Sequence, residues 1–113
     1  MKTIYKGLSY DFVFEIPEYN GSFSGAYVVF AQNGVGIYKI DFNAEEVFGN
    51  KIEVTLTGEQ TDAFSHKMPV SAQVVYTYSY SGVAHTKATE VQTYRVHRTL
   101  PYTDPVVGGA NNE

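Results

Sequence analysis

The sequence predicts an all-β protein: an antiparallel β-sandwich with immunoglobulin-like proportions, about seven strands and one short helical turn near residues 58–64. Aromatic residues make up 15% of the 113 residues, with ten Tyr and seven Phe, and such side chains favour half-buried strands over helices. Apolar and polar residues alternate in several short segments, which is the period of a strand. Turn-forming pairs separate those segments. A small closed barrel is the alternative, because alternation does not show whether a sheet closes.

The first strand is expected at residues 10–16, where apolar side chains alternate with more polar neighbours until Pro17. Residues 18–25, EYNGSFSG, are rich in Gly, Ser and Asn and predict an exposed loop. This loop offers three side chains as contacts for a ligand or partner: Tyr19, Asn20 and Phe23.

A hairpin is expected at residues 26–43, because Asn33 and Gly34 separate two apolar runs there. That pair tolerates the positive φ angles of a type I′ turn, which makes it the strongest local signal in the sequence. The chain is then expected to leave the sheet at residues 44–50.

Residues 51–56 alternate again and predict another strand. Thr57 and Gln60 follow with the spacing of a capping box, so a single helical turn is expected to run to about Phe64. Ala63 and Phe64 would close one end of the core.

Residues 70–99 predict a long hairpin folded about Ser81 and Gly82. The return strand changes the phase of its apolar residues, which predicts a β-bulge near Gln92 and Thr93. A hairpin of this length commits the fold to β structure.

The first strand of this hairpin carries a tyrosine stripe, which consists of Tyr76, Tyr78 and Tyr80. Three interpretations stay open: packing against the return strand, a contact surface for a partner, and stacking on a sugar. For packing, the return strand would offer Ala84, Thr86 and Ala88.

We expect residues 1–99 to form a single domain and residues 100–113 to be a flexible tail or docking arm. The last segment contains Pro and Gly and shows no periodicity. Leu100 and Tyr102 are its candidate contact residues. An open sandwich with an aromatic hairpin needs a covered edge, so self-association or incorporation into a larger assembly is expected.

Composition excludes several classes of function. The net charge is −4 without acidic or basic blocks, so nucleic-acid binding is disfavoured. The absence of Cys excludes disulfides and thiolate metal sites. The N-terminal residues lack the apolar core of a signal peptide, and no window is long and apolar enough for insertion into a membrane.

Catalytic chemistry finds little support in the sequence. Three side chains titrate naturally near neutral pH, namely His66, His85 and His97. A catalytic or metal site at His85 and His97 would also need a carboxylate, and Glu90 is the only acidic residue between them. Paired carboxylates occur at two places: Glu45 with Glu46, and Glu59 with Asp62. These fit solvated positions better than a sugar-hydrolysing pair. We therefore expect the protein not to be an enzyme and to bind no cofactor or metal. A small enzyme with its site at His85, His97 and Glu90 is kept as the last of three hypotheses, after the two that follow below.

Several packing and turn residues occupy the places that they have in a known family of domains. From residue 51 onward these are Leu56 and Thr57, Thr61 and Phe64, Gly82, and residues 91–96; near the start they are Gly7, Asp11, Phe12 and Phe14. On these residues the chain resembles the N-terminal domain of phage baseplate upper proteins. That family continues into a receptor-binding or coiled-coil region, which we do not expect here, so a head-decoration, tail or connector protein with the same sandwich is an alternative to a baseplate position.

The resemblance implies a non-enzymatic phage virion structural protein, assembled in the host cytoplasm. Its partners would be other virion proteins and copies of itself in a symmetric assembly. The alternative is a carbohydrate-binding β-sandwich module, in which Tyr19, Phe23 or the tyrosine stripe stacks on a glycan and Asn20 supplies a polar contact.

Overall fold

The computed structural model describes residues 1–43 and 49–100. Within these ranges the chain forms eight strands and one short helix: β1 (Lys2–Tyr5), β2 (Tyr10–Glu15), β3 (Ser22–Gln32), β4 (Val35–Asn43), β5 (Lys51–Leu56), α1 (Gly58–Asp62), β6 (Val70–Tyr80), β7 (Val83–Ala88) and β8 (Gln92–His97). No helix in the described ranges is long and apolar enough to cross a membrane.

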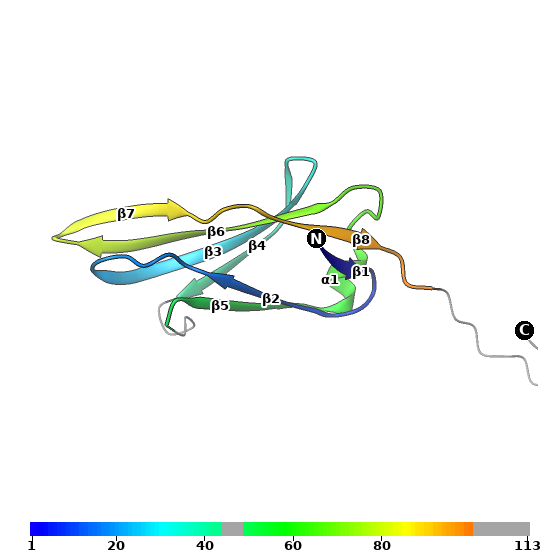
Figure 1. Ribbon diagram of the computed structural model, residues 1–113, viewed down its shortest axis with the longest axis horizontal. Helices are drawn as coiled ribbons and strands as arrows, with labels where there is room; N and C mark the ends of the chain where they lie inside the picture. The colour runs from blue at the N-terminus through cyan, green and yellow to red at the C-terminus, as the bar shows by residue number, and fades with distance from the viewer. Residues whose placement is uncertain (44–48, 101–113) are drawn as a thin grey trace, which may run out of the picture.

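The strands form two layers (Figure 1). The larger sheet has the order β1-β8-β6-β3-β4, and β7 pairs with β6 beside this path. The smaller sheet consists of β2 and β5 and covers one face of the larger one. The predicted all-β sandwich is thus confirmed, and the described strands fall into two sheets rather than one closed barrel.

Strand β1 is an addition that the sequence pattern did not reveal. It pairs with β8 in parallel, from Lys2 opposite Tyr94 to Tyr5 opposite His97. The expectation of a wholly antiparallel fold is wrong at this one pairing. Only Ile4 of this strand is fully buried, so four residues with a single core position give no readable alternation.

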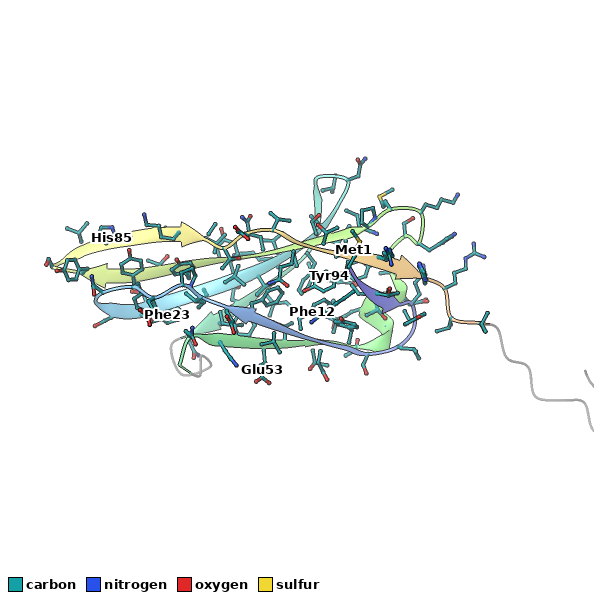
Figure 2. The ribbon with its side chains drawn as sticks, viewed as in Figure 1. Met1, Phe12, Phe23, Glu53, His85 and Tyr94 are labelled. Atoms are coloured by element: carbon teal, nitrogen blue, oxygen red, sulfur yellow. The ribbon has the colours of Figure 1, made fainter. Side chains whose placement is uncertain are left out.

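The core lies between the two layers and contains a group of aromatic rings. Phe12 of β2 lies 4.9 Å from Phe30 of β3 and 5.1 Å from Tyr94 of β8, measured between ring centroids. Figure 2 shows Phe12 and Tyr94 between the layers. The predicted strands at residues 10–16 and 51–56 are confirmed, because their alternate apolar residues are buried.

Both predicted hairpin turns are present as two-residue turns. Asn33 and Gly34 have φ angles of 52° and 76°, and Ser81 and Gly82 have φ angles of 53° and 75°. Two consecutive positive φ angles are the mark of the type I′ turn, whose twist matches that of paired strands.

The expected loop at residues 18–25 is shorter than predicted. Strand β3 already begins at Ser22, which pairs with Ser79 of β6, and Phe23 pairs with Tyr78. Phe23 is therefore a strand residue and not a loop contact. Pairing with a strand more than fifty residues away overrides the turn preference of the local sequence.

The return strand of the long hairpin is broken into β7 and β8. On β6, Ala72 and Val75 are three positions apart, whereas their partners Gln92 and Ala88 are four positions apart. The return strand thus has one residue more than β6 over this stretch, which is the effect of a bulge. The extra residue lies within residues 89–91 and not at the predicted Gln92 and Thr93.

Thr89 bridges this break. Its backbone N–H donates to the Val74 carbonyl at 2.9 Å, and its hydroxyl accepts from the Val74 N–H at 3.1 Å. The Gln73 amide donates to the Thr89 carbonyl at 2.8 Å. These bonds keep the chain beside β6 while the register changes.

The capping box of α1 is confirmed. The Thr57 hydroxyl accepts from the Gln60 N–H at 3.2 Å, and the Gln60 side chain accepts from the Thr57 N–H at 2.8 Å. Phe64 is fully buried as expected, but the expectation for Ala63 is wrong because this residue is exposed.

Candidate functional site

The tyrosine stripe runs from the core to the solvent. Tyr76 is 5% exposed, Tyr78 is half-buried and Tyr80 is 51% exposed. Tyr76 therefore belongs to the core, and only the outer part of the stripe contributes to the surface.

Tyr19 and Phe23, predicted as separate loop contacts, meet the stripe in one aromatic cluster. The Tyr19 ring stacks on Tyr78 with centroids 4.9 Å apart, and Phe23 lies 6.1 Å from Tyr19. The chain between β2 and β3 places Tyr19 here, because β3 starts alongside the end of β6. Asn20 is exposed and has no role in the cluster.

The return strand meets the stripe through different residues than expected. Tyr76, Tyr78 and Tyr80 lie opposite Lys87, His85 and Val83, respectively. The predicted partners Ala84, Thr86 and Ala88 lie opposite residues on the other face of β6. Because the turn has two residues, Tyr80 pairs with Val83. The expected pairing differs from this one by a single position, and such a shift moves every side chain to the other face of the sheet.

Two aromatic rings stack on Tyr78. His85 of β7 stacks on it with centroids 5.1 Å apart and planes 19° apart, whereas Tyr19 stacks at 25°. Tyr19 lies in the connection before β3 and His85 lies on β7, and β3 and β7 are the two strands that flank β6 here. Two near-parallel rings already stack on Tyr78, which leaves less of its aromatic surface for a sugar.

Burial changes the acidity of two tyrosines. Desolvation raises the pKa of Tyr76, and neighbouring Tyr78 adds to this effect. Desolvation, with a smaller effect of Tyr10, raises the pKa of Tyr94 to about 12. The Tyr94 hydroxyl donates to the Gln92 side chain at 2.9 Å. Both phenols are therefore neutral parts of the core at physiological pH.

The raised pKa of Tyr94 predicts a loss of stability at alkaline pH. Because the folded protein favours the neutral phenol, its contribution is complete below pH 10 and is lost as the pH rises towards 12. We expect the free energy of unfolding to fall by about 2 kcal/mol over this range. Urea unfolding of the wild type and of Tyr94→Phe would measure this effect. An equal decline in both proteins would contradict the assignment to Tyr94.

The histidines do not form a shared site. His85 lies opposite Tyr78, near the hairpin turn, whereas His97 lies opposite Tyr5 at the far end of β8. Glu90 lies in the connection between their strands. No group of three metal-binding side chains occurs in the described ranges. The catalytic hypothesis around these residues therefore lacks a converging site, and Glu45 and Glu46 lie outside the described residues.

A shallow groove that the sequence did not indicate follows one side of the sandwich. This groove, which we call the seam groove, has a volume of about 720 Å³ and lies between β2 and the connection from β7 to β8. Side chains that border it include Lys2, Val13, Glu15, Glu18, Glu90 and Val91. Residues from four distant segments meet here, so no local motif could have predicted it.

The larger sheet also has a face without a second layer in the described ranges, which we call the outer face (Figure 1). Tyr27, Val29 and Val75 lie on this face and are only half-buried. Lys39 lies 4.6 Å from the Tyr27 ring and 3.2 Å from Asp41. The outer face is thus apolar at its centre, with one charged pair beside it.

The chain leaves the domain after β8, at residues 98–100, which we call the exit segment. Leu100, a predicted contact residue, is 92% exposed. Arg98 donates from Nε to Nδ1 of His66 at 3.4 Å. Tyr102, the other predicted contact, lies outside the described residues.

No protein-family model matches the chain, and neither the curated proteins nor the solved structures include one that matches it.

Proposed function

We propose that this protein is a non-enzymatic structural component of a symmetric protein assembly and that it acts through protein–protein interfaces. The outer face carries this proposal, because half-buried Tyr27, Val29 and Val75 form an apolar centre on a sheet that has no covering layer in the described ranges. Apolar surface of this kind is typical of interaction sites.

The free edges of the larger sheet support the same function. Among the described strands, β4 pairs only with β3, and β7 pairs only with β6. Strand β4 has nine residues and includes no Pro, and the devices that protect its exposed edge are one Lys and the register shift at Ile37. Outside these positions, strands of a neighbouring protein could pair with either edge.

The virion setting rests on the resemblance to the N-terminal domain of phage baseplate upper proteins. In a phage the partners would be other virion proteins and copies of this chain, assembled in the host cytoplasm. Terminase, portal or tail genes beside the gene of this protein would support that setting, and a neighbourhood of metabolic genes would count against it.

The carbohydrate-binding alternative is weaker, because Tyr19 and His85 already stack on Tyr78. Tyr80 is the exposed tyrosine of the stripe, and it lies beside the Gly82 turn. A single exposed ring provides less stacking area than the predicted stripe of three.

The outer face is expected to mediate association with other copies. Val29→Glu would place a carboxylate at the apolar centre, opposite Lys39, so the variant can fold while its surface becomes charged. We expect it to weaken self-association at least tenfold, measured by light scattering across micromolar to millimolar concentrations. Ser9→Glu adds the same charge at an exposed position outside the strands and should associate like the wild type. A wild type that stays monomeric throughout would contradict the proposal.

A further inference from the structure

The edge of β2 that borders the seam groove has backbone groups that pair with no other strand of the described residues. Ile16 donates its N–H to the Asn50 carbonyl at 2.7 Å, in line with the register of β2 and β5. Because N–H and C=O directions alternate along an antiparallel strand, Val13 and Glu15 point their backbone groups away from β5. These groups have the geometry to bind one more strand.

The side chains around this edge select the chemistry of such a strand. Glu15, Glu18 and Glu90 border the seam groove together with a single cation, Lys2. Val13 and Val91 are 50% and 55% exposed beside these carboxylates. An extended segment that alternates a basic and an apolar side chain would complement both features.

The exit segment has this pattern. Arg98 and Leu100 are two residues apart, so in an extended conformation both side chains lie on the same face. Neither belongs to a strand or helix, and Leu100 is 92% exposed. The protein has two Arg among its 113 residues. One of them, Arg98, lies where the chain leaves the domain.

We propose that the exit segment of one copy binds in the seam groove of a second copy as an added antiparallel strand on β2. The inference rests on the proposed assembly function and names its contact. Arg98 pairs with Glu15 of the other copy, and Leu100 packs on its Val13. Val13 and Glu15 are also two residues apart, so a single antiparallel register satisfies both pairs and the outward backbone groups.

This contact forms between copies and not within one. In its own domain Arg98 contacts His66 at the end of β8, whereas the nearest bordering residue of the groove on that strand, Gln92, lies at the opposite end. These ends are about 17 Å apart at the rise of a strand. Each copy has one exit segment and one seam groove, so the association closes either as a two-fold dimer with reciprocal exchange or, head-to-tail, as a ring.

Cross-linking between introduced cysteines tests the register, because the native chain has no Cys. Val13→Cys and Leu100→Cys proteins, mixed and treated with a short bismaleimide, are expected to give a covalent dimer as the main product. Val83→Cys is the matched control, since Val83 is 55% exposed but lies at the hairpin turn. If Leu100→Cys cross-links to Val83→Cys as efficiently as to Val13→Cys, the proposed register is wrong.

Exchange of charges tests the pairing in solution. Glu15→Arg and Arg98→Glu are each expected to weaken self-association at least tenfold, and the protein with both substitutions should recover most of it. Glu59→Arg makes the same charge change on α1 and should have no effect, and thermal unfolding would verify that all variants are folded. If the wild type associates and both reversals associate equally well, the contact is wrong while the assembly function stands. A wild type that never associates would reject the assembly function itself.

Discussion

Phe12→Ala is expected to lower the free energy of unfolding by about 3–5 kcal/mol. Phe12 is 1% exposed, and its ring lies 4.6–6.1 Å from the rings of Tyr10, Phe14, Phe30 and Tyr94. In the described ranges, no strand of the smaller sheet pairs with a strand of the larger one. Side-chain packing therefore holds the layers together, and Ala would leave a cavity at its centre.

Urea unfolding measures this loss directly, and Val83→Ala is the matched control. Val83 lies beside the hairpin turn and its side chain is 55% exposed, so its truncation should change the free energy of unfolding by less than about 0.5 kcal/mol. A cost below about 1 kcal/mol for Phe12→Ala would show that the layers do not depend on this ring.

Gly21→Ala is expected to destabilise the protein by more than about 2 kcal/mol. Gly21 has a φ angle of 109°, and a Cβ atom there would clash with the backbone oxygen of Ser79, only 2.0 Å away. Backbone atoms of a paired strand cannot move aside cheaply. The substitution would separate the start of β3 from β6 and withdraw Tyr19 from Tyr78.

Gly34→Ala separates the effect of φ from that of contact. Gly34 has a φ angle of 76°, but nothing lies within 4 Å of the place that an alanine methyl group would take, so only the backbone preference is lost, at a cost of about 1 kcal/mol. Near-UV circular dichroism should change for Gly21→Ala and not for Gly34→Ala, because the chain has no Trp and its signal comes mainly from tyrosines. Equal costs for both variants would contradict the predicted clash.

Local patterns predicted most of the fold because their physical causes are local. The two type I′ turns follow from residues that tolerate positive φ, and the capping box follows from Thr57 and Gln60, three residues apart. The alternation in β2 and β5 follows from one buried face. Each of these signals lies within a few residues of the structure that it determines.

The remaining features depend on contacts between distant segments. Strand β1 forms only because β8 offers it an edge. Thr61, buried on α1, accepts from the Gly7 N–H and donates to the Leu8 carbonyl, a pairing that its own neighbourhood does not show. Gln32 likewise bonds across to Ser65 and Met68.

The candidate site illustrates the same division. The sequence singled out Tyr19, Phe23 and Tyr78 as candidate contact residues, but it treated them as two separate contact regions. The fold joins them into one cluster and buries Tyr76. The seam groove and the outer face arise only from the pairing of strands.

Native mass spectrometry of the full chain at low ionic strength tests the central claim most directly, which is that this protein works by assembling with itself. We expect a series of oligomers that ends at one dominant closed size, with dissociation on addition of salt because Arg98 and Glu15 attract each other through charge. A single species at the monomer mass of 12.6 kDa at every concentration would contradict it.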